Sequence, residues 1–266
     1  MNIFEQISRN FSDGAELGPT FPLRHISGLL GRKYHVTAVK GAGTIRIRPK
    51  TSDAQTFVDI FRHKTYDLSR WPQFRSVMAA YQRLLDAGQI PIIIDAGANV
   101  GAASIWFSRQ FPRARILAIE PDAENVALCR LNTSGLPNVK IIEAAIGSES
   151  GSVSLKNPTN QAWAIQATRD EEGKTAVCTI PDIVRAEQSP AKLFLVKVDI
   201  EGFEDDLFAD NTGWIDAAEV IIIEPHDWLF AGKGTSKNFQ KAIGSGNFEI
   251  LIYRENLIYI RLHSQK

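Results

Sequence analysis

Regular hydrophobic runs separated by polar segments begin near residue 90. Five runs have the length and composition of strands buried on both faces, at residues 90–94, 115–119, 139–143, 193–198 and 220–223. Two segments between them are predicted helices, 102–110 and 123–132. Because strands that alternate with helices form parallel βαβ units, this pattern predicts an α/β fold with a doubly wound, mostly parallel, Rossmann-like sheet.

The end of the chain has a different pattern. Residues 248–253 and 257–262 are two apolar runs on either side of Arg254-Glu255-Asn256. This spacing is typical of an antiparallel hairpin, because a short polar turn joins two strands of equal length. We therefore expect a C-terminal antiparallel hairpin that adds one antiparallel strand at the far edge of the sheet.

The first 89 residues are irregular and rich in Arg, Gly and Pro. Residues 35–40 and 44–48 alternate apolar and polar positions around a Gly-Ala-Gly turn, which predicts a hairpin. Ser52-Asp53 offers an N-cap for a helix through Ile60, and residues 74–87 have helical periodicity. We expect an N-terminal α+β extension at 1–89 that caps the acceptor side, and a cofactor-binding domain at 90–266.

Composition excludes several classes of protein. The 266 residues include 30 Lys or Arg and 30 Asp or Glu, so the formal net charge is zero and gives no basic footprint for nucleic acid. The two cysteines form no metal-binding cluster, and a reducing compartment is the simpler interpretation. No signal peptide or membrane-spanning segment is recognisable, which makes the cytoplasm the expected location. The oligomeric state stays open.

A glycine-containing loop follows the first buried strand, with the sequence DAGANVG at 95–101. Gly97 and Gly101 are four residues apart, which departs from the G-x-G-x-x-G fingerprint of dinucleotide-binding proteins. Asp95 is unfavourable beside a pyrophosphate, whereas it suits a ligand with an amino group and a carboxylate, such as S-adenosylmethionine. A tight turn without a ligand is the alternative.

Glu120 ends the second strand, 23 residues after Gly97. An acidic residue at this place can accept hydrogen bonds from the hydroxyls of a ribose. Alone, this signal is weak because glutamate is also common at helix starts. With the glycine loop it indicates a cofactor that contains adenosine. Small apolar residues after the third strand, Ala144 to Gly147, are placed to lie near the adenine.

Charged residues collect where the fourth and fifth strands end, in KVDIEG (197–202) and EPH (224–226). Burying such residues is costly unless they are paired or functional. Because the ends of neighbouring parallel strands are adjacent, we expect Asp199, Glu224 and His226 to converge. A structural polar network is the alternative, and Lys197 is expected to pair with an acidic neighbour.

These blocks together resemble the FkbM family of S-adenosylmethionine-dependent methyltransferases, from about residue 50 to about 262. The matching segments are DAGANVG (95–101), EPDAENVALCRLN (120–132), AAIGSESG (144–151), KVDIEGFE (197–204) and IEPH (223–226). The family often has a second proline in the EPxP block, whereas Ala123 stands there. The resemblance implies methylation of a hydroxyl on a small-molecule or glycan acceptor, such as a sugar or natural-product scaffold, with S-adenosylhomocysteine as product.

The resemblance also implies roles for individual residues. Those predicted to bind the cofactor are Asp95, Gly97, Ala98, Asn99, Gly101, Glu120, Pro121, Ala145, Ile146 and Asp199. Those predicted on the acceptor side are His226, Asp199, Glu201 and Glu224. A hydroxyl needs a base or a metal to take its proton, and His226 is the first candidate because histidine titrates near neutral pH. Asp199 is the competing base, and a divalent metal on Asp199, Glu224 and His226 is a third version.

Other functions remain open at this stage. A nicotinamide-dependent oxidoreductase uses a similar sheet, although the spacing of Gly97 and Gly101 argues against it. A non-catalytic module that keeps the cofactor fold is the second alternative. Trp163, Trp228 and Phe230 are candidate stacking residues for an acceptor, with packing the more frequent role. We expect the arginines 46, 48, 62 and 70 to form a solvated face rather than an acceptor pocket.

Overall fold

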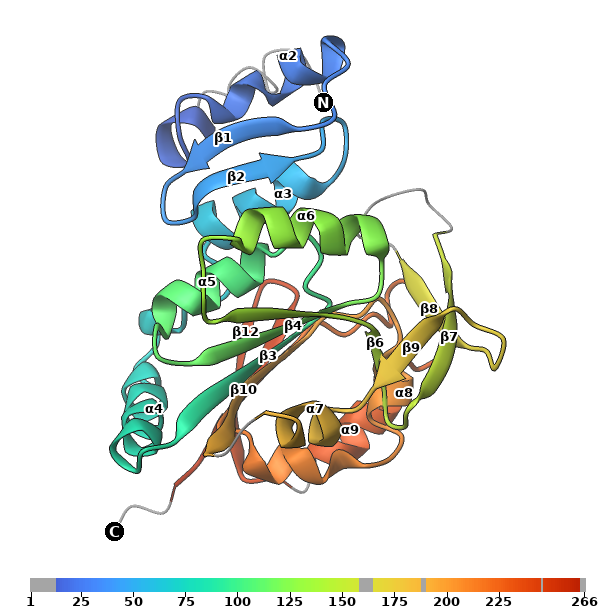
Figure 1. Ribbon diagram of the computed structural model, residues 1–266. Coiled ribbons are helices and arrows are strands. Elements are labelled where there is room, and N and C mark those ends of the chain that lie inside the picture. Colours follow the sequence, from blue (N-terminus) through green and yellow to red (C-terminus); the bar gives the residue numbers. More distant parts are fainter. Residues whose placement is uncertain (1–12, 158–164, 188–189, 245, 264–266) are drawn as a thin grey trace.

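A seven-stranded sheet forms the centre of the computed structural model, which describes residues 13–157, 165–187, 190–244 and 246–263 (Figure 1). In spatial order its strands are β12 (Phe248–Tyr253), β13 (Asn256–Arg261), β11 (Val220–Ile223), β10 (Ala191–Val198), β3 (Ile90–Ala96), β4 (Arg115–Glu120) and β5 (Val139–Glu143). From β11 to β5 all neighbours are parallel, whereas β13 is antiparallel to both of its neighbours. The predicted doubly wound sheet is confirmed, with the antiparallel strand one place inside the edge.

Alternate residues of the central strands pack on opposite faces of the sheet. Ile92 and Ile94 belong to one core cluster and Ile93 to the other, as the two-residue period of a strand requires. Figure 1 shows α5 (Ala102–Gln110) and α6 (Ala123–Thr133) above the sheet and α7 (Ile180–Arg185), α8 (Glu204–Leu207) and α9 (Lys237–Ile243) below it. The helix α4 (Phe74–Asp86) shares the core cluster of α5, and η4 (Thr212–Ala217) shares the core cluster of α9.

The N-terminal region contains the predicted hairpin and several short helices. The hairpin strands are β1 (His35–Val39) and β2 (Gly43–Ile47), and the helices are η1 (Phe21–Leu23), α2 (Arg24–Leu29), α3 (Asp53–Phe57) and η3 (Leu68–Arg70). The helix expected to reach Ile60 ends its α-helical part at Phe57 and continues as one π-helical segment, η2 (Val58–Arg62).

The hairpin is fastened to the rest of the protein by packing and by one side-chain amide. Ile45 and Ile47 belong to the same core cluster as Phe107 of α5. Asn132 of α6 accepts a hydrogen bond from the Arg46 backbone N–H at 2.7 Å and donates to its carbonyl at 3.0 Å. The Asn132 side chain therefore satisfies both backbone hydrogen-bonding groups of Arg46 in β2, which fixes the hairpin above α6. The domain boundary at residue 89 stays a prediction.

A second, four-stranded sheet was missing from the sequence prediction. Its order is β6 (Ala145–Ile146), β9 (Thr175–Cys178), β7 (Gly151–Lys156) and β8 (Gln166–Arg169). It lies beside the carboxyl end of the main sheet in Figure 1, where Ala145 and Ala167 reach the main cavity. None of the helices in the described residues combines the length and apolar composition that crossing a membrane requires.

Candidate functional site

One cavity lies at the carboxyl ends of β3, β4, β10 and β11. This is where an open α/β sheet binds its ligands. Ten of the predicted residues line it, namely Gly97, Ala98, Asn99, Glu120, Pro121, Ala145, Ile146, Asp199, Glu201 and Glu224. Asp95, Gly101 and His226 do not belong to the lining. The structure therefore brings most of the predicted residues together and places three of them behind the cavity wall.

The two glycines of the loop after β3 have different roles. Gly97 has a φ of +75°, and a Cβ added there would lie 1.8 Å from the Asp199 carbonyl oxygen. Only glycine allows the loop to cross the end of β10 so closely. At Gly101 an added Cβ would lie 2.9 Å from Sγ of Cys129, on α6. Gly101 is thus required where α5 begins against α6, which is packing rather than contact with a ligand.

Asp95 is fully buried under the loop and pairs with Lys197. Lys197 Nζ lies 3.2 Å from Asp95 Oδ1 and 3.4 Å from Asp199 Oδ2. It also donates to the carbonyls of Ala96 and Gly97, at 3.2 and 2.8 Å. Burial lowers the pKa of Lys197, but the two carboxylates outweigh burial and raise it overall. The predicted pairing of Lys197 is confirmed, and this cation holds the loop against β10.

Glu120 forms the wall at the end of β4, with both oxygens occupied by donors. Its Oε2 accepts from the Asn99 N–H at 2.8 Å, and Oε1 accepts from the Asp122 N–H at 3.0 Å and from Asn125 Nδ2 at 3.3 Å. Burial raises its pKa to about 7, which these three donors oppose. Because each oxygen can accept further bonds, the carboxylate still suits the hydroxyls of a ribose.

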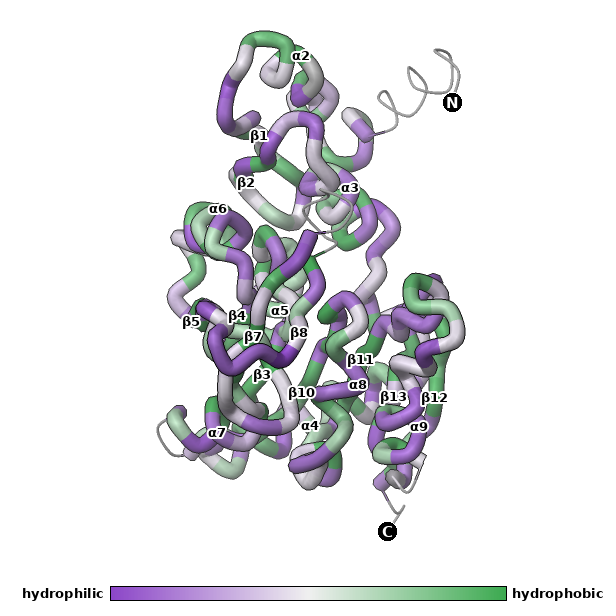
Figure 2. Tube along the Cα trace, turned by 90° about the vertical axis from the view of Figure 1, so that its right-hand side faces the viewer, coloured by the Kyte–Doolittle hydropathy of each residue, from purple (hydrophilic) through white to green (hydrophobic). Residues whose placement is uncertain are grey.

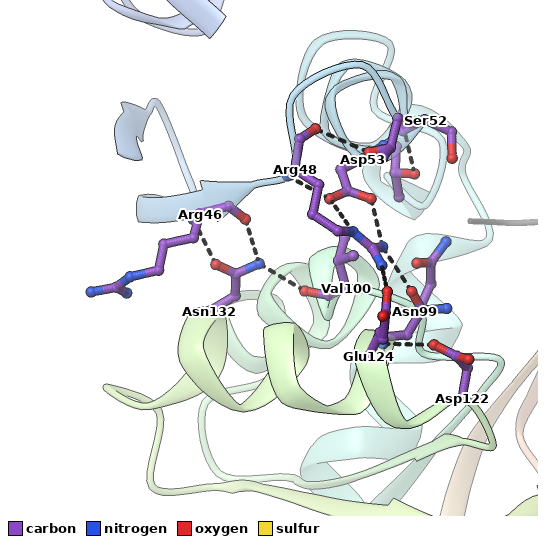
Figure 3. Close-up of polar contacts among 12 residues, drawn as sticks. Arg46, Arg48, Ser52, Asp53, Asn99, Val100, Asp122, Glu124 and Asn132 are labelled. Carbon is purple, nitrogen blue, oxygen red and sulfur yellow. Dashed lines mark hydrogen bonds and ion pairs between the residues drawn. The ribbon is translucent and has the colours of Figure 1, made fainter. Parts of the chain in front are cut away.

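A chain of hydrogen bonds through Asn125 connects Glu120 to Arg48 of the N-terminal region, and Figure 3 shows Arg48 beside Asp53. Arg48 Nη2 donates to Asn125 Oδ1 at 2.7 Å and to Asp53 Oδ1 at 2.8 Å. Because the guanidinium contains only donors, it fixes the Asn125 amide with its oxygen toward Arg48 and its nitrogen toward Glu120. The predicted solvated face is therefore wrong for Arg48, which holds a buried carboxylate, and for Arg62, which pairs with Asp13 at 2.8 Å.

Four carboxylates surround the imidazole of His226 where β10 and β11 end. Glu204 Oε1 lies 2.9 Å from Nδ1, and the other three carboxylates face Nε2. Their distances from Nε2 are 3.5 Å for Glu201, 3.7 Å for Asp199 and 3.8 Å for Glu224. The convergence expected from neighbouring parallel strands is present. The sequence did not reveal Glu204, because it lies in a helix beyond the strand end.

Crowding changes the protonation of this cluster. Burial lowers the pKa of His226, but the hydrogen bond that its Nδ1 donates to Glu204 and the charge of the nearby carboxylates raise it to about 9 overall. Burial and the charge of Asp199 raise the pKa of Glu201 and of Glu224 to about 8. His226 is thus a buried cation at neutral pH, whereas the carboxyl groups of Glu201 and Glu224 titrate close to neutral pH.

Several lining residues lacked any signal in the sequence. Thr65 and Tyr66 enter from the N-terminal region, and Asn256 enters from the first position of β13. Among the described residues, the side-chain oxygens of Asn99 and Asn256 are buried without a hydrogen-bond partner. Buried polar atoms usually have partners, so these amides are suited to a polar ligand in the cavity. Trp228 is 64% exposed, and Trp163 lies outside the described residues.

The donor set fits an adenosine-containing cofactor and permits a cation. Glu120, the buried Asn99 amide and the small residues Ala144 and Ala145 would hold the nucleoside end. At the other end, Asp199, Glu224 and His226 each offer a ligand atom, and these atoms lie within 4.8 Å of one another. Mixed carboxylate and imidazole ligands suit several divalent cations. The Nδ1 contact to Glu204 is the second contact that a metal-bound histidine normally makes.

Comparison with known proteins identifies related sequences of low identity. The 2-O-methyltransferase NoeI of Sinorhizobium fredii is 24% identical over 155 residues, which cover 52% of this chain and 64% of that protein. Methyltransferase 1 of Beauveria bassiana is 24% identical over 223 residues, 74% of this chain and 81% of that protein. The alignment thus spans less than two thirds of NoeI.

Solved structures and a family match complete the comparison. The methyltransferase PaMTH1 of Podospora anserina, described as bound to S-adenosylhomocysteine, has 12% identity and a TM-score of 0.42, with coverage of 90% of this chain and 94% of that one. Residues 95–240 match the Methyltransferase FkbM domain, which is more than half of the chain and includes both ends of the cavity. The chain belongs to the FkbM methyltransferase family.

Proposed function

We propose that the protein is an S-adenosylmethionine-dependent O-methyltransferase for a hydroxyl on a sugar or natural-product scaffold. The observation that carries this proposal is the continuous lining that joins Glu120 at one end of the cavity to Asp199, Glu201 and Glu224 at the other. The first end suits a ribose and the second suits a hydroxyl that must lose a proton. When bound, S-adenosylmethionine supplies an electrophilic methyl group.

Glu120 and the loop that contains Asn99 would bind and orient the cofactor. The Glu120 carboxylate accepts hydrogen bonds from ribose hydroxyls, and its own three donors fix its orientation. Lys197 keeps the loop in place by holding the carbonyls of Ala96 and Gly97. Positioning of this kind supplies a large part of the rate enhancement when two bound groups must meet in line.

The proton of the acceptor hydroxyl goes to a carboxylate that lines the cavity. Asp199, with its side chain 27% exposed, and Glu224, at 19%, are accessible from the cavity, whereas His226 is only 1% exposed. A base with a pKa near the working pH is the most efficient, and Glu224 meets this condition. His226 acts as a positioning residue that holds these carboxylates together, in place of the base role expected from its residue type.

Cofactor binding is the first test, because it does not require the acceptor. Isothermal titration should show binding of S-adenosylhomocysteine and none of NAD, and the reverse result would establish the oxidoreductase alternative. Glu120→Ala should weaken S-adenosylhomocysteine binding by about 10- to 100-fold, since hydrogen bonds to a charged group are worth about 1.5–3 kcal/mol. Glu143→Ala at the end of β5 is the matched control, because Glu143 is absent from the cavity lining.

Turnover with a panel of hydroxylated sugars and natural products is the second test. Glu224→Gln should reduce S-adenosylhomocysteine production by about 100-fold or more while cofactor affinity changes little, because general-base catalysis contributes about 10²–10⁴-fold. Near-normal turnover would remove Glu224 as the base, and no turnover by the unmodified protein on any acceptor would favour the non-catalytic module. A parallel titration with EDTA decides the metal version, which unchanged activity would exclude.

A further inference from the structure

The region around α2 has an unusual concentration of exposed apolar side chains. Five large hydrophobic residues within 14 positions are between 46% and 81% exposed, namely Leu23, Ile26, Leu29, Leu30 and Val36. Four of them also line one shallow hollow with Tyr34 and Arg32. Contiguous apolar surface of this kind marks an interaction site in a folded protein more often than it marks chance exposure. We refer to these five residues as the α2 patch.

The segment that carries the α2 patch is strongly basic. Residues 17–52 contain seven cations and no Asp or Glu, although the whole chain has no net charge. Arg32 lines the hollow, Lys33 lies 5.3 Å from the centre of the Tyr34 ring, and a Cβ added at Gly28 would lie 3.4 Å from Cε of Lys50. These three cations, all exposed, therefore lie next to the apolar residues.

Nearby acidic groups do not neutralise this surface. Asp13 and Asp53, on either side of the basic segment, are only 2% and 1% exposed, and the more exposed Glu16 pairs with Arg62 at 3.2 Å. Asp13 is paired with Arg24 and Arg62, and Asp53 with Arg48. Figure 2 shows α2 at the end of the molecule opposite the C-terminus, where hydrophilic and hydrophobic segments lie side by side. This end can approach a flat surface without obstruction from the sheet.

We propose that the α2 patch docks the protein on an anionic membrane surface. Exposed leucine and isoleucine side chains enter the boundary between headgroups and acyl chains, while the adjacent Arg32, Lys33 and Lys50 contact lipid phosphates. A nucleic acid would use the cations and leave the leucines exposed, and an ordinary protein partner would not require the exposed cations Arg32, Lys33 and Lys50 beside the apolar residues. The docking is independent of the proposed methyl transfer, and no segment of the chain has to cross the bilayer.

Sedimentation with vesicles of two compositions tests the proposal on the full chain. Binding to phosphatidylcholine vesicles that contain phosphatidylglycerol should be strong at low salt, weaker at high salt, and at least about tenfold weaker without the anionic lipid. Arg32→Glu with Lys33→Glu should weaken binding by about 25-fold or more, since each lost cation accounts for about fivefold.

A matched pair of apolar substitutions separates the patch from general surface effects. Leu29→Asp with Leu30→Asp should abolish vesicle binding, whereas Ile250→Asp with Ile252→Asp should leave it unchanged, although Ile250 and Ile252 are also 52% and 69% exposed. Unchanged binding of S-adenosylhomocysteine, or an unchanged melting temperature, shows that each variant is folded. If the leucine pair does not fold, Leu29→Ser alone replaces it, because Leu29 is 81% exposed.

Four results would overturn the proposal. The full chain fails to bind anionic vesicles, or all variants bind them equally. Removal of residues 1–12 creates vesicle binding that the full chain lacks, which makes that segment the occupant of the patch. Leu29→Asp dissolves a dimer in sedimentation velocity, which makes the occupant a second copy. None of these outcomes depends on cofactor binding or turnover, so failure here is distinct from failure of the proposed enzyme activity.

Discussion

The two ends of the cavity hold their carboxylates in opposite ways. At the end proposed for the nucleoside of the cofactor, which we call the nucleotide end, a single carboxylate, Glu120, accepts hydrogen bonds from two backbone N–H groups and one amide. At the other end, which we call the chemical end, carboxylate oxygens of Asp199, Glu201 and Glu224 lie 3.5–3.8 Å from Nε2 of His226. Glu201 Oε2 has no hydrogen-bond partner among the described residues. The first arrangement suits a neutral group, such as a ribose hydroxyl, in one orientation, whereas the second has an excess of negative charge that favours uptake of a proton or a cation.

Lys197 connects the two ends, and its loss should have the largest effect. Lys197→Met leaves Asp95 as a buried carboxylate without a cation, which costs about 3–5 kcal/mol of unfolding free energy when one partner of a buried pair is removed. Urea denaturation measures the change. Lys140→Met is the control, because the Lys140 side chain is 54% exposed and its partner Glu187 keeps a second cation, Arg115. Equal losses in the two variants would contradict the assigned role of Lys197.

The affinity for the cofactor should depend on pH through Glu120 at the nucleotide end. The pKa of Glu120 is about 7, and only its ionised form accepts hydrogen bonds from both ribose hydroxyls through both oxygens. Affinity for S-adenosylhomocysteine should therefore fall as pH decreases below 7, by about tenfold per pH unit well below the pKa. Titration calorimetry from pH 5 to 8 measures it, and Glu120→Gln should give a flat profile. A flat profile for the unmodified protein would remove the ribose role.

The positions of many site residues could be predicted from the sequence, because residues at the ends of adjacent parallel strands become neighbours. Asp199 and His226 lie 27 residues apart in the chain, yet β10 and β11 are adjacent and parallel, so their ends must meet. The residue type of His226 says nothing about its burial, which depends on Glu204 and on the packing of the loops. For this reason the sequence suggested a base where the structure has a buried cation.

Other features were not predictable for reasons of length and distance. The strands of the second sheet have two to six residues, and β8 contains no buried position, so no apolar alternation marks it. Arg48 and Asn125 are 77 residues apart, and a contact at that separation appears only when the hairpin docks on α6. Local patterns predict elements well, whereas contacts between distant polar residues depend on the complete fold.

Asn125 allows a finer test of the nucleotide end. Asn125→Ala removes one of the three donors to Glu120, and a hydrogen bond to a charged group is worth about 1.5–3 kcal/mol at most. At 3.3 Å this bond is long, so affinity for S-adenosylhomocysteine at pH 7 should fall by about fivefold. Because the donor lowers the pKa of Glu120, the pH midpoint of binding should move upward in the variant. A loss of affinity with an unchanged midpoint would show that Asn125 acts only through shape.

Substitution of Arg48 should have the smallest effect on cofactor affinity. It distinguishes the orientation of the Asn125 amide from the attachment of the N-terminal region. Arg48→Lys keeps the positive charge but cannot bond Asp53 and Asn125 through one rigid fork, so the Asn125 amide loses its fixed orientation. Cofactor affinity should fall by about twofold, with a small upward shift of the same pH midpoint. Asp53→Asn is the matched control, since it weakens the attachment of the N-terminal region while the Arg48–Asn125 bond remains. If Asp53→Asn shifts the midpoint as much as Arg48→Lys does, attachment of the N-terminal region, rather than the orientation of one amide, determines how the nucleotide end binds its cofactor.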